Sequence, residues 1–260
     1  MNQTTAHALN AINLAFYRER ADEFSASREY AWPGWKRLLP HLDAARMPDG
    51  PLRVLDLGCG NGRFAAFLAE QLGDAGASLR YCGVDASDPL LARARARALP
   101  GERCAWHALD FVQSPGRLPD GPFEFIALLG VLHGVPGQGQ RRALLREAAA
   151  RLAPGGRLAL TCWRFAELDR FRKRLVSWET YNRRALQPID PGQLEPGDHL
   201  MPWGRGKQWL RYCHATGADE REALVRGLAL RCVESFLADG RSADLNHYAV
   251  YEAARAPRLR

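Results

Sequence analysis

The sequence lacks several patterns that would assign it to a class at once. Its 260 residues contain no apolar run of about 18 residues, the length at which a helix crosses a membrane. The N-terminus lacks a basic start followed by an apolar stretch, so we expect no secretory signal and a cytoplasmic protein. The six cysteines are scattered without a C-x-x-C pair, which argues against a zinc site and a disulfide framework. We therefore expect neither a membrane partner nor a bound metal.

Lysine is also nearly missing, although the chain is basic. Only three of the 36 basic residues are lysine, and the formal net charge is +7. A basic surface attracts nucleic acid and other polyanions. A coding bias toward arginine and alanine produces the same composition, so the charge alone does not establish RNA binding.

Strand and helix patterns alternate through the middle of the chain. Apolar runs predict strands at 52–58, 79–85, 104–110, 123–132 and 157–163, and helical spacing predicts helices at 61–73, 88–99 and 140–156. This alternation is typical of a parallel sheet with helices on both faces. Two strand patterns in succession, LRCVESFLADG and LNHYAVYEA, predict a final antiparallel hairpin. The fold class we expect is α/β, a Rossmann-like doubly wound sheet of seven strands with an antiparallel last strand.

Two regions lie outside this alternation. Residues 1–48 predict an N-terminal helical cap, interrupted by a Trp-Pro break at Trp32-Pro33. Residues 164–208 contain charges, several prolines and the sequence PWGRG, and they predict an insertion after the fifth strand of the domain 49–260. We expect the N-terminal helices and this insertion to cover the functional site.

The strongest motif is VLDLGCGNGRF at 54–64, in which glycines follow a strand and open a helix. Nicotinamide-binding loops have G-x-G-x-x-G at this place, where the helix N-terminus faces a pyrophosphate. Here the spacing is G-x-G-x-G, and Asp56 stands two residues before the first glycine. A carboxylate there would repel pyrophosphate but suits a ligand with an ammonium and a sulfonium. The pattern D-x-G-x-G-x-G therefore predicts S-adenosyl-L-methionine as the cofactor of a methyltransferase, with a plain tight turn as the alternative.

Acidic residues at the next strand ends extend this predicted cofactor site. Asp85 closes the second strand and suits the ribose hydroxyls, although an acid there also caps a helix. By resemblance to methyltransferases, Asp110 and Phe111 hold the adenine; a loop cap is the alternative for Asp110. The residues predicted to bind the cofactor are Asp56, Gly58, Cys59, Gly60, Asn61, Asp85, Ala86, Asp110, Phe111 and Leu129.

The end of the fourth strand bears on the methyl acceptor. It has the sequence GVLHG at 130–134 and lacks the Asn/Asp-Pro-Pro-aromatic cluster that many amino-group methyltransferases carry there. This absence weighs against transfer to an amino nitrogen. His133 is the polar residue in this segment, and the sequence leaves a site role and a buried structural role equally open.

Short flanking motifs add a more specific resemblance. The chain contains Phe-Ser-x-x-Arg followed by Trp-Pro, a Val-Leu-His, a Pro-Trp and an Arg-Tyr-Cys-His. These motifs resemble those of the tRNA wobble-uridine carboxymethyl methyltransferases, the family shared with the methyltransferase domain of the AlkB-homologue tRNA enzyme. The matching residues are Phe24, Ser25, Arg28, Trp32, Pro33, Val131, Leu132, His133, Pro202, Trp203, Arg211, Tyr212 and His214. Gly134 and Cys213 depart from the family, which has His and Tyr there, and so alter the expected substrate pocket.

The resemblance implies a reaction in which a carboxylate on a modified wobble uridine of tRNA becomes a methyl ester. A carboxylate has a pKa near 4 and is ionised at neutral pH, so it needs no general base. Arginine suits the clamping of such a group, because its planar fork donates two parallel hydrogen bonds. The catalytic candidates are Arg28, His133, Arg211 and His214. Trp32, Trp203 and Tyr212 either stack on a base or pack in the core.

Other functions stay open at this point. The fold hosts many substrates, so a small-molecule O- or N-methyltransferase is the alternative to a tRNA enzyme. A non-enzymatic binding module is a third interpretation, against which the intact glycine motif argues. The family's small zinc-binding activator subunit is a partner that the sequence neither requires nor excludes. A basic groove leading to the site would favour tRNA, and a closed apolar pocket would favour a small molecule.

Overall fold

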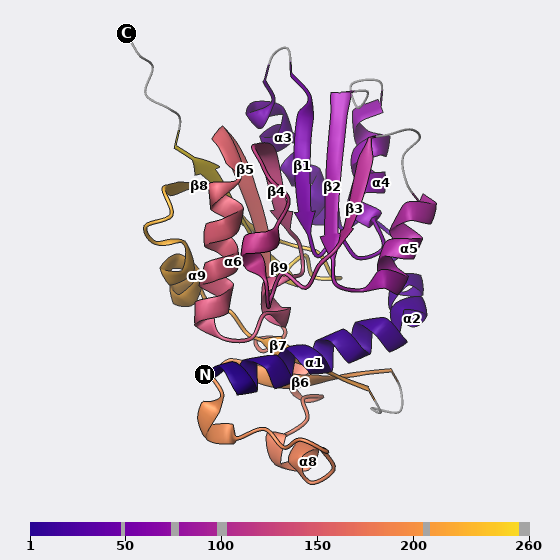
Figure 1. Ribbon diagram of the computed structural model, residues 1–260, viewed down its shortest axis with the longest axis vertical. Helices are drawn as coiled ribbons and strands as arrows, with labels where there is room; N and C mark the ends of the chain where they lie inside the picture. Colours follow the sequence, from indigo (N-terminus) through magenta and orange to yellow (C-terminus); the bar gives the residue numbers. More distant parts are fainter. Residues whose placement is uncertain (48–49, 74–77, 98–102, 205–208, 255–260) are drawn as a thin grey trace.

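A computed structural model describes residues 1–47, 50–73, 78–97, 103–204 and 209–254. Its centre is a seven-stranded sheet in the order β3-β2-β1-β4-β5-β9-β8 (Figure 1). The strands β1 to β5 pair in parallel, whereas β9 pairs antiparallel with both β5 and β8. The expected sheet and its antiparallel last strand are therefore confirmed.

The order of the elements agrees with the alternation in the sequence, but one predicted helix is too long. Helix α6 ends at Ala150 and β5 begins at Leu152, so residues 152–156 of the predicted helix 140–156 belong to the strand. The third and fourth strands end at Ala108 and Leu128, before the predicted ends at 110 and 132. The sheet strands are β1 Leu52–Leu57, β2 Leu79–Asp85, β3 Cys104–Ala108, β4 Phe123–Leu128, β5 Leu152–Trp163, β8 Leu230–Ala238 and β9 Asn246–Ala253. The helices along the sheet are η1 Pro33–Leu38, α3 Leu39–Ala45, α4 Arg63–Leu72, α5 Asp88–Arg97, η3 Pro115–Arg117, η4 Leu132–Gly134, α6 Gln138–Ala150 and α9 Ala218–Val225.

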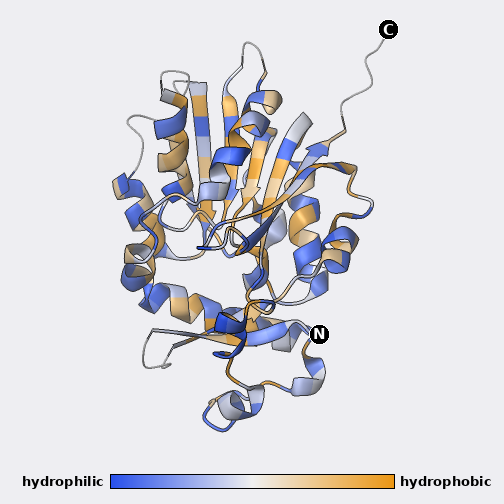
Figure 2. Ribbon diagram, turned by 180° about the vertical axis from the view of Figure 1, so that it is seen from behind, coloured by the Kyte–Doolittle hydropathy of each residue, from blue (hydrophilic) through white to orange (hydrophobic). Residues whose placement is uncertain are grey.

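The core lies on both faces of this sheet, because its central strands are apolar on both sides. All six residues of β4 are buried. On one face, aromatic residues of η1 and α4, including Trp35 and Phe64, pack against Phe125. On the other face, Leu144 and Leu145 of α6 pack against the strands. Figure 2 shows the consequence, with apolar strands in the centre and helices that turn polar faces outward.

The second layer of structure lies beneath the edge at which the parallel strands end (Figure 1). Helices α1 Gln3–Glu19 and α2 Ala21–Ala26 cross this edge, and α1 contacts the two-stranded antiparallel sheet of β6 and β7. That sheet and its neighbours are α7 Asp169–Arg172, α8 Trp178–Asn182, η5 Pro191–Gln193, β6 Asp198–Trp203 and β7 Trp209–His214. We call α1, α2 and the described part of 164–215 the cover.

The predicted domain limits fall on residues that the structure does not describe. The limit at 48 and 49 lies outside the described residues, and the first helix begins at Gln3. The limit at 208 also lies outside them, and it separates β6 from β7, which pair from Asp198–His214 to Trp203–Trp209. Backbone pairing therefore extends the insertion to the end of β7. No helix in the described ranges is long and apolar enough to span a membrane.

Candidate active site

A cavity of about 820 Å³ lies between the strand ends and the cover. Residues of the glycine turn and of the second, third and fourth strand ends form one wall. Leu14 and Tyr17 of α1 and Pro202 and Trp203 of β6 form part of the opposite wall. The N-terminal helices and the insertion thus cover the site as the sequence predicts. The volume is within the range of pockets that bind small molecules and cofactors.

The glycine turn has the backbone that its sequence predicts. Gly58 has a φ of 76°, and a Cβ there would lie 2.5 Å from the side chain of Val131. Gly60 has a φ of 53° and lines the cavity, with no atom within 4 Å of the place where its Cβ would be. Only glycine adopts such angles without strain. The space over Gly60 therefore lets a ligand approach the backbone closely, which fits an S-adenosylmethionine site.

Asp56 is the acid that precedes this turn, and it is buried beneath it with 3% of its surface exposed. The hydroxyl of Tyr81 on the neighbouring strand donates a hydrogen bond to its carboxylate. Burial raises the pKa of Asp56 to about 7, against the smaller effect of the Tyr81 hydrogen bond. A bound cation would favour the ionised form of this carboxylate. Asp56 therefore supplies negative potential toward a positively charged ligand.

Asp85 joins the second strand to the glycine turn. Its two carboxylate oxygens accept hydrogen bonds of 2.9 Å from the backbone N–H groups of Gly60 and Ser87. Burial raises the pKa of Asp85, and these backbone hydrogen bonds oppose that shift. A carboxylate has about four lone-pair positions, so it retains acceptor capacity for two ribose hydroxyls. Both interpretations of Asp85 from sequence, as a cap near the start of helix α5 and as a ligand for ribose, are compatible with this geometry.

Asp110 has a partner that the sequence did not indicate. One carboxylate oxygen accepts the N–H of Val112 at 3.0 Å, which is the loop cap, and the other accepts Nδ2 of Asn10 at 2.7 Å. Asn10 belongs to α1, so this contact fastens the cover to the third strand end. All ten residues predicted to bind the cofactor line the cavity, with Phe111 and Leu129 among them.

Arg28 and Arg211 meet on the acceptor side of the cavity. Both line it, and both pack against Trp203, with guanidinium-to-ring distances of 5.3 and 5.0 Å. Arg28 also lies 3.8 Å from the ring of Phe24, and Arg211 is buried with 4% exposed. Within the described residues, no carboxylate lies within 4 Å of either guanidinium. In the part of the chain that the structure describes, two cations thus face one cavity without an ion-pair partner.

Electrostatics make this pair unusual. Burial, and then the neighbouring charge of Arg211, lower the pKa of Arg28 to about 9. The guanidinium is still charged at neutral pH, but its charge is destabilised by lost hydration and by repulsion. The Nε of Arg211 is buried without a hydrogen-bond partner in the described part of the chain. An anion bound between the two side chains would relieve both costs.

His133 lies beside this pair, with 8% of its surface exposed. Its ring contacts Trp163 edge to face at 5.4 Å between centroids. Burial, followed by the charges of Arg211 and Arg28, lowers the pKa of His133 to about 3. The imidazole is therefore neutral at physiological pH and is a weak base. The neutral ring can form a hydrogen bond with the molecule that accepts the methyl group. It does not act as a charged imidazolium that donates a proton.

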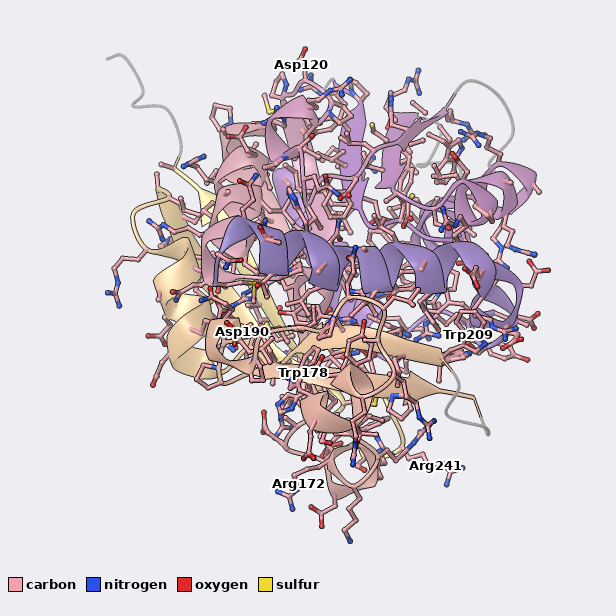
Figure 3. The ribbon with its side chains drawn as sticks, turned by 60° about the horizontal axis from the view of Figure 1, so that its bottom comes forward. Asp120, Arg172, Trp178, Asp190, Trp209 and Arg241 are labelled. Atoms are coloured by element: carbon pink, nitrogen blue, oxygen red, sulfur yellow. The ribbon has the colours of Figure 1, made fainter. Side chains whose placement is uncertain are left out.

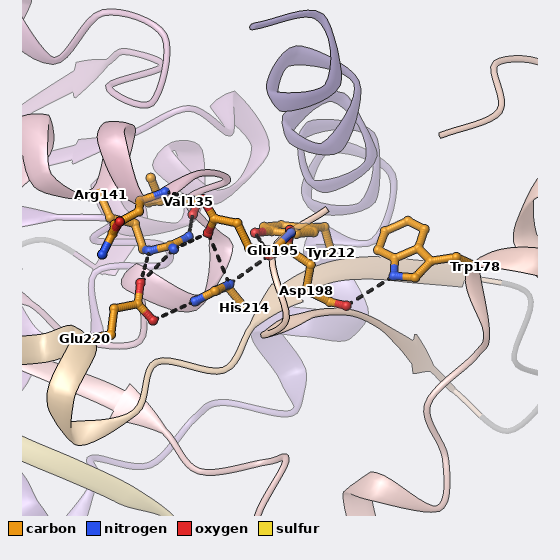
Figure 4. Close-up of polar contacts among 9 residues, drawn as sticks. Val135, Arg141, Trp178, Glu195, Asp198, Tyr212, His214 and Glu220 are labelled. Carbon is orange, nitrogen blue, oxygen red and sulfur yellow. Dashed lines mark hydrogen bonds and ion pairs between the residues drawn. The ribbon is translucent and has the colours of Figure 1, made fainter. Parts of the chain in front are cut away.

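His214 is the predicted catalytic residue that the structure places elsewhere. It is not among the described residues that line the cavity. Its Nδ1 lies 2.7 Å from Asp198 and its Nε2 lies 2.8 Å from Glu220 (Figure 4). Tyr212, a candidate for base stacking, is fully buried and donates a hydrogen bond to the same Asp198 at 2.6 Å. The family-like Arg-Tyr-x-His motif thus divides between the cavity, through Arg211, and a structural network.

This network connects the cover to the sheet domain. Arg141 of α6 is fully buried and binds Glu195 of the insertion and Glu220 of α9, at 2.5 and 2.7 Å (Figure 4). Donor atoms of Glu195, His214 and Glu220 lie within 4.8 Å of one another, as metal ligands do. The guanidinium of Arg141 already bridges the two carboxylates, so the charge that a cation would supply is present. We assign the group a structural role.

The residues that the sequence analysis missed are those that join distant segments. Asn10, Tyr81 and Trp163 all contact site residues, yet each contact crosses to another element of the fold. Tyr81 reaches Asp56 because β1 and β2 pair in parallel register. No local pattern in the sequence indicates such pairs.

The fold and the glycine turn define a class of enzyme. Residues 55–158 match the model of a methyltransferase domain family. Over 218 residues, the chain is 38% identical to a trans-aconitate 2-methyltransferase from Streptomyces coelicolor, covering 76% of this chain and 67% of that protein. The chain therefore belongs to the class I S-adenosylmethionine-dependent methyltransferases. It is an enzyme of this class, and its cofactor is S-adenosyl-L-methionine.

Two further similarities describe the range of relatives. A probable tRNA methyltransferase 9B from Bos taurus is 26% identical over 188 residues, or 70% of this chain; the chain spans only 37% of that protein. The N-methyltransferase NodS from Bradyrhizobium japonicum, solved with S-adenosyl-L-homocysteine, has a TM-score of 0.53 at 21% identity and covers 96% of this chain and 98% of its own. That structural likeness concerns the fold.

Proposed function

We propose that this enzyme transfers the methyl group of S-adenosylmethionine to a carboxylate oxygen of its acceptor, and that Arg28 and Arg211 hold this carboxylate. The observation that carries the proposal is the pair of guanidiniums facing the cavity without a carboxylate within 4 Å in the described chain. A carboxylate between them would satisfy both forks and return each side chain to an electrically balanced environment.

The chemistry is consistent with the surrounding groups. S-adenosylmethionine supplies a methyl group on a positively charged sulfur, and the acceptor oxygen forms the new C–O bond as the C–S bond breaks. A carboxylate reaches this step already ionised, so a general base is unnecessary. This agrees with the low pKa, about 3, of His133. The work left to the protein is to orient the anion and to exclude water, which the arginines and the aromatic residues of the cover perform.

For the acceptor, we propose a carboxylate on a modified wobble uridine of tRNA. The flanking motifs resemble the tRNA carboxymethyl methyltransferases, a relative carries the name probable tRNA methyltransferase 9B, and the net charge is +7. Gly134 departs from that family, and a Cβ at this position would lie 3.5 Å from Nδ2 of Asn13. Asn13 therefore lies in contact with the position from which the family's second histidine would extend.

A small carboxylic acid is the second candidate, and two observations favour it. The cavity is covered by α1 and β6, as a small-molecule pocket is. The Streptomyces relative is named a trans-aconitate 2-methyltransferase, and its match covers more of the two chains than the bovine match does. Both candidates share the arginine-held carboxylate.

The test measures methyl transfer from radiolabelled S-adenosylmethionine to tRNA carrying 5-carboxymethyluridine and, separately, to trans-aconitate. Mild alkali then distinguishes an ester, which releases methanol, from an N-methyl product, which does not. We expect an alkali-labile product on tRNA, and its loss in Arg211→Gln with cofactor binding retained. Ester on trans-aconitate alone would select the second candidate. An alkali-stable product, or no product with either acceptor, would remove the carboxylate proposal.

A further inference from the structure

A basic segment of the cover borders the cavity. The segment 164–184 contains seven basic and three acidic residues. Its acids are engaged locally, since Asp169 pairs with Arg172 at 2.5 Å and with Lys173 at 4.0 Å. The excess of positive charge therefore has no counterpart within the segment.

The exposed part of this segment forms a small face with the loop after β8. In the described chain, no carboxylate lies within 4 Å of Arg170, Arg174 or Arg241, and all three are exposed. Arg170 reaches this loop, which is residues 239–245. Its Nη2 lies 3.4 Å from the point where a Cβ would be if Gly240 had a side chain. Figure 3 shows Arg172 of the cover and Arg241 of the loop after β8 at the same end of the molecule, far from Asp120 at the opposite end. We call Arg170, Arg172, Lys173, Arg174 and Arg241 the basic face.

Side-chain contacts connect this face to the arginine pair inside. Arg174 and its neighbour Phe171 both line the cavity. Phe171 contacts Trp163 edge to face at 5.2 Å, and the ring of Trp163 lies 5.7 Å from the guanidinium of Arg211. A chain of aromatic surfaces thus leads from the exposed cations to the proposed carboxylate site.

We infer that the basic face is a docking surface for the phosphate backbone of RNA, which positions an acceptor nucleotide in the cavity. Exposed arginine and lysine side chains neutralise phosphates and so bind nucleic acid without reading its sequence. The aromatic wall of Phe171 and Trp163 suits a flat nucleobase, which stacks on such rings. Acidic side chains supply the negative charge but not the flat ring that such a wall binds. The inference rests on the proposed function for its acceptor, but RNA binding is measured without methyl transfer.

The test compares two triple variants of the full chain by fluorescence anisotropy with a labelled tRNA transcript at several salt concentrations. The face variant is Arg172→Ser, Lys173→Ser and Arg241→Ser. The control variant is Arg95→Ser, Arg117→Ser and Arg226→Ser, which removes three exposed cations outside the cover. Cofactor binding by calorimetry verifies that each variant is folded.

We expect the face variant to bind the transcript at least about tenfold more weakly, with a slope of log affinity against log salt that is smaller by about 2, because phosphate contacts release counterions. The control variant should stay close to the wild type. Equal losses in both variants would mean unspecific attraction and would overturn the inference, as would unchanged binding in the face variant. If polyglutamate bound as tightly as the transcript, the partner of the basic face would be an acidic protein and not RNA. Failure of ester formation with intact RNA binding would reject the proposed function alone.

Discussion

The two walls of the cavity are built from the sequence in different ways. The ten predicted cofactor residues all lie between positions 56 and 129, and each stands at or just after the end of a parallel strand. The acceptor wall takes Arg28 from the N-terminal region, His133 from the segment after β4, and Trp203 and Arg211 from the insertion. These ten residues form the cofactor wall, and the sheet fixes their relative positions. The acceptor wall depends in addition on contacts that hold the cover to the sheet domain, among them those of Arg141 with Glu195 and Glu220.

The largest effect on stability is expected when the contacts between the cover and helices α6 and α9 are removed. Arg141→Met deletes the buried guanidinium that binds Glu195 and Glu220, so both carboxylates lose this cation, and Glu220 keeps only its contact with His214. Breaking such a buried pair from one side costs about 3–5 kcal/mol. We expect a loss of this size in the free energy of unfolding, measured by urea denaturation. Arg146→Met on the same helix is the control, because this side chain is 66% exposed.

The control should change the free energy of unfolding by no more than about 0.5 kcal/mol, as exposed substitutions generally do. If Arg141→Met unfolds at the same urea concentration as Arg146→Met, the network does not hold the cover, and the contrast between the two walls loses its physical basis.

The arginine pair should show the next largest effect, on turnover. Arg28→Lys and Arg211→Lys keep the charge but lose the planar fork, so the acceptor carboxylate is held less well. We expect turnover to fall by about tenfold to a thousandfold, at about 1.4 kcal/mol per decade. Cofactor affinity, measured by calorimetry, should change little, and Arg18→Lys on the exposed side of α1 should leave both unchanged.

If both lysine variants turn over at the wild-type rate, Arg28 and Arg211 do not hold the acceptor carboxylate. A fall in cofactor affinity for Arg28→Lys, with turnover otherwise retained, would instead assign Arg28 to the carboxylate of the cofactor itself. Arg28 lies close enough to the cofactor residues for this role, because its backbone carbonyl accepts a hydrogen bond of 3.3 Å from Nδ2 of Asn61 in the glycine turn.

The same contrast explains how far the sequence alone could be interpreted. The strands, the helices along the sheet and the glycine turn follow from apolar periodicity and local turn chemistry, which act over a few residues. Gly58 and Gly60 could be placed because positive φ angles leave a sequence signal. The insertion was recognisable only as an interruption, because the partner of β7 is β6 and not the main sheet.

His214 shows where motif reasoning reached its limit. A histidine in a family-like motif is a reasonable catalytic candidate from sequence. Its neighbours Asp198 and Glu220 come from β6 and α9, and no spacing in the chain indicates that all three meet. Arg28 and Arg211 were found by the same motifs and do face the cavity. The difference lies in tertiary contacts, which the sequence does not record locally.

On the cofactor wall, Asp85→Ala should have a smaller and more confined effect. The change removes the acceptor of the Gly60 and Ser87 N–H groups together with the proposed ribose contacts. We expect cofactor affinity to weaken by about 1–3 kcal/mol, the scale of lost hydrogen bonds to a charged group. Calorimetry measures it, with Asp120→Ala at the far edge as the control (Figure 3). Unchanged affinity would exclude Asp85 from the site.

The smallest expected effect is a pH dependence of the free energy of unfolding that arises from His214, in the network that connects the cover to the sheet domain. Burial alone would lower the pKa of His214, but hydrogen bonds to Asp198 and Glu220 outweigh it and raise the pKa. A raised pKa means that protonated His214 stabilises the fold. This contribution is fully present below the unfolded pKa of about 6.5 and is lost as the pH rises through the higher folded value.

The variant His214→Gln isolates this contribution. Its deficit in free energy of unfolding, relative to the wild type, should be larger near pH 5.5 than near pH 9, by about 1.4 kcal/mol for each unit of the raised pKa. Asp198 and Glu220 have lowered pKa values, so their stabilisation is lost only at more acidic pH and does not vary across this window. His107→Gln, at an exposed position of β3, is the matched control. A deficit that is equal at both pH values would mean that folding does not raise the pKa of His214. The network would then hold the cover through Arg141 alone, and the acceptor wall would be independent of pH in this range.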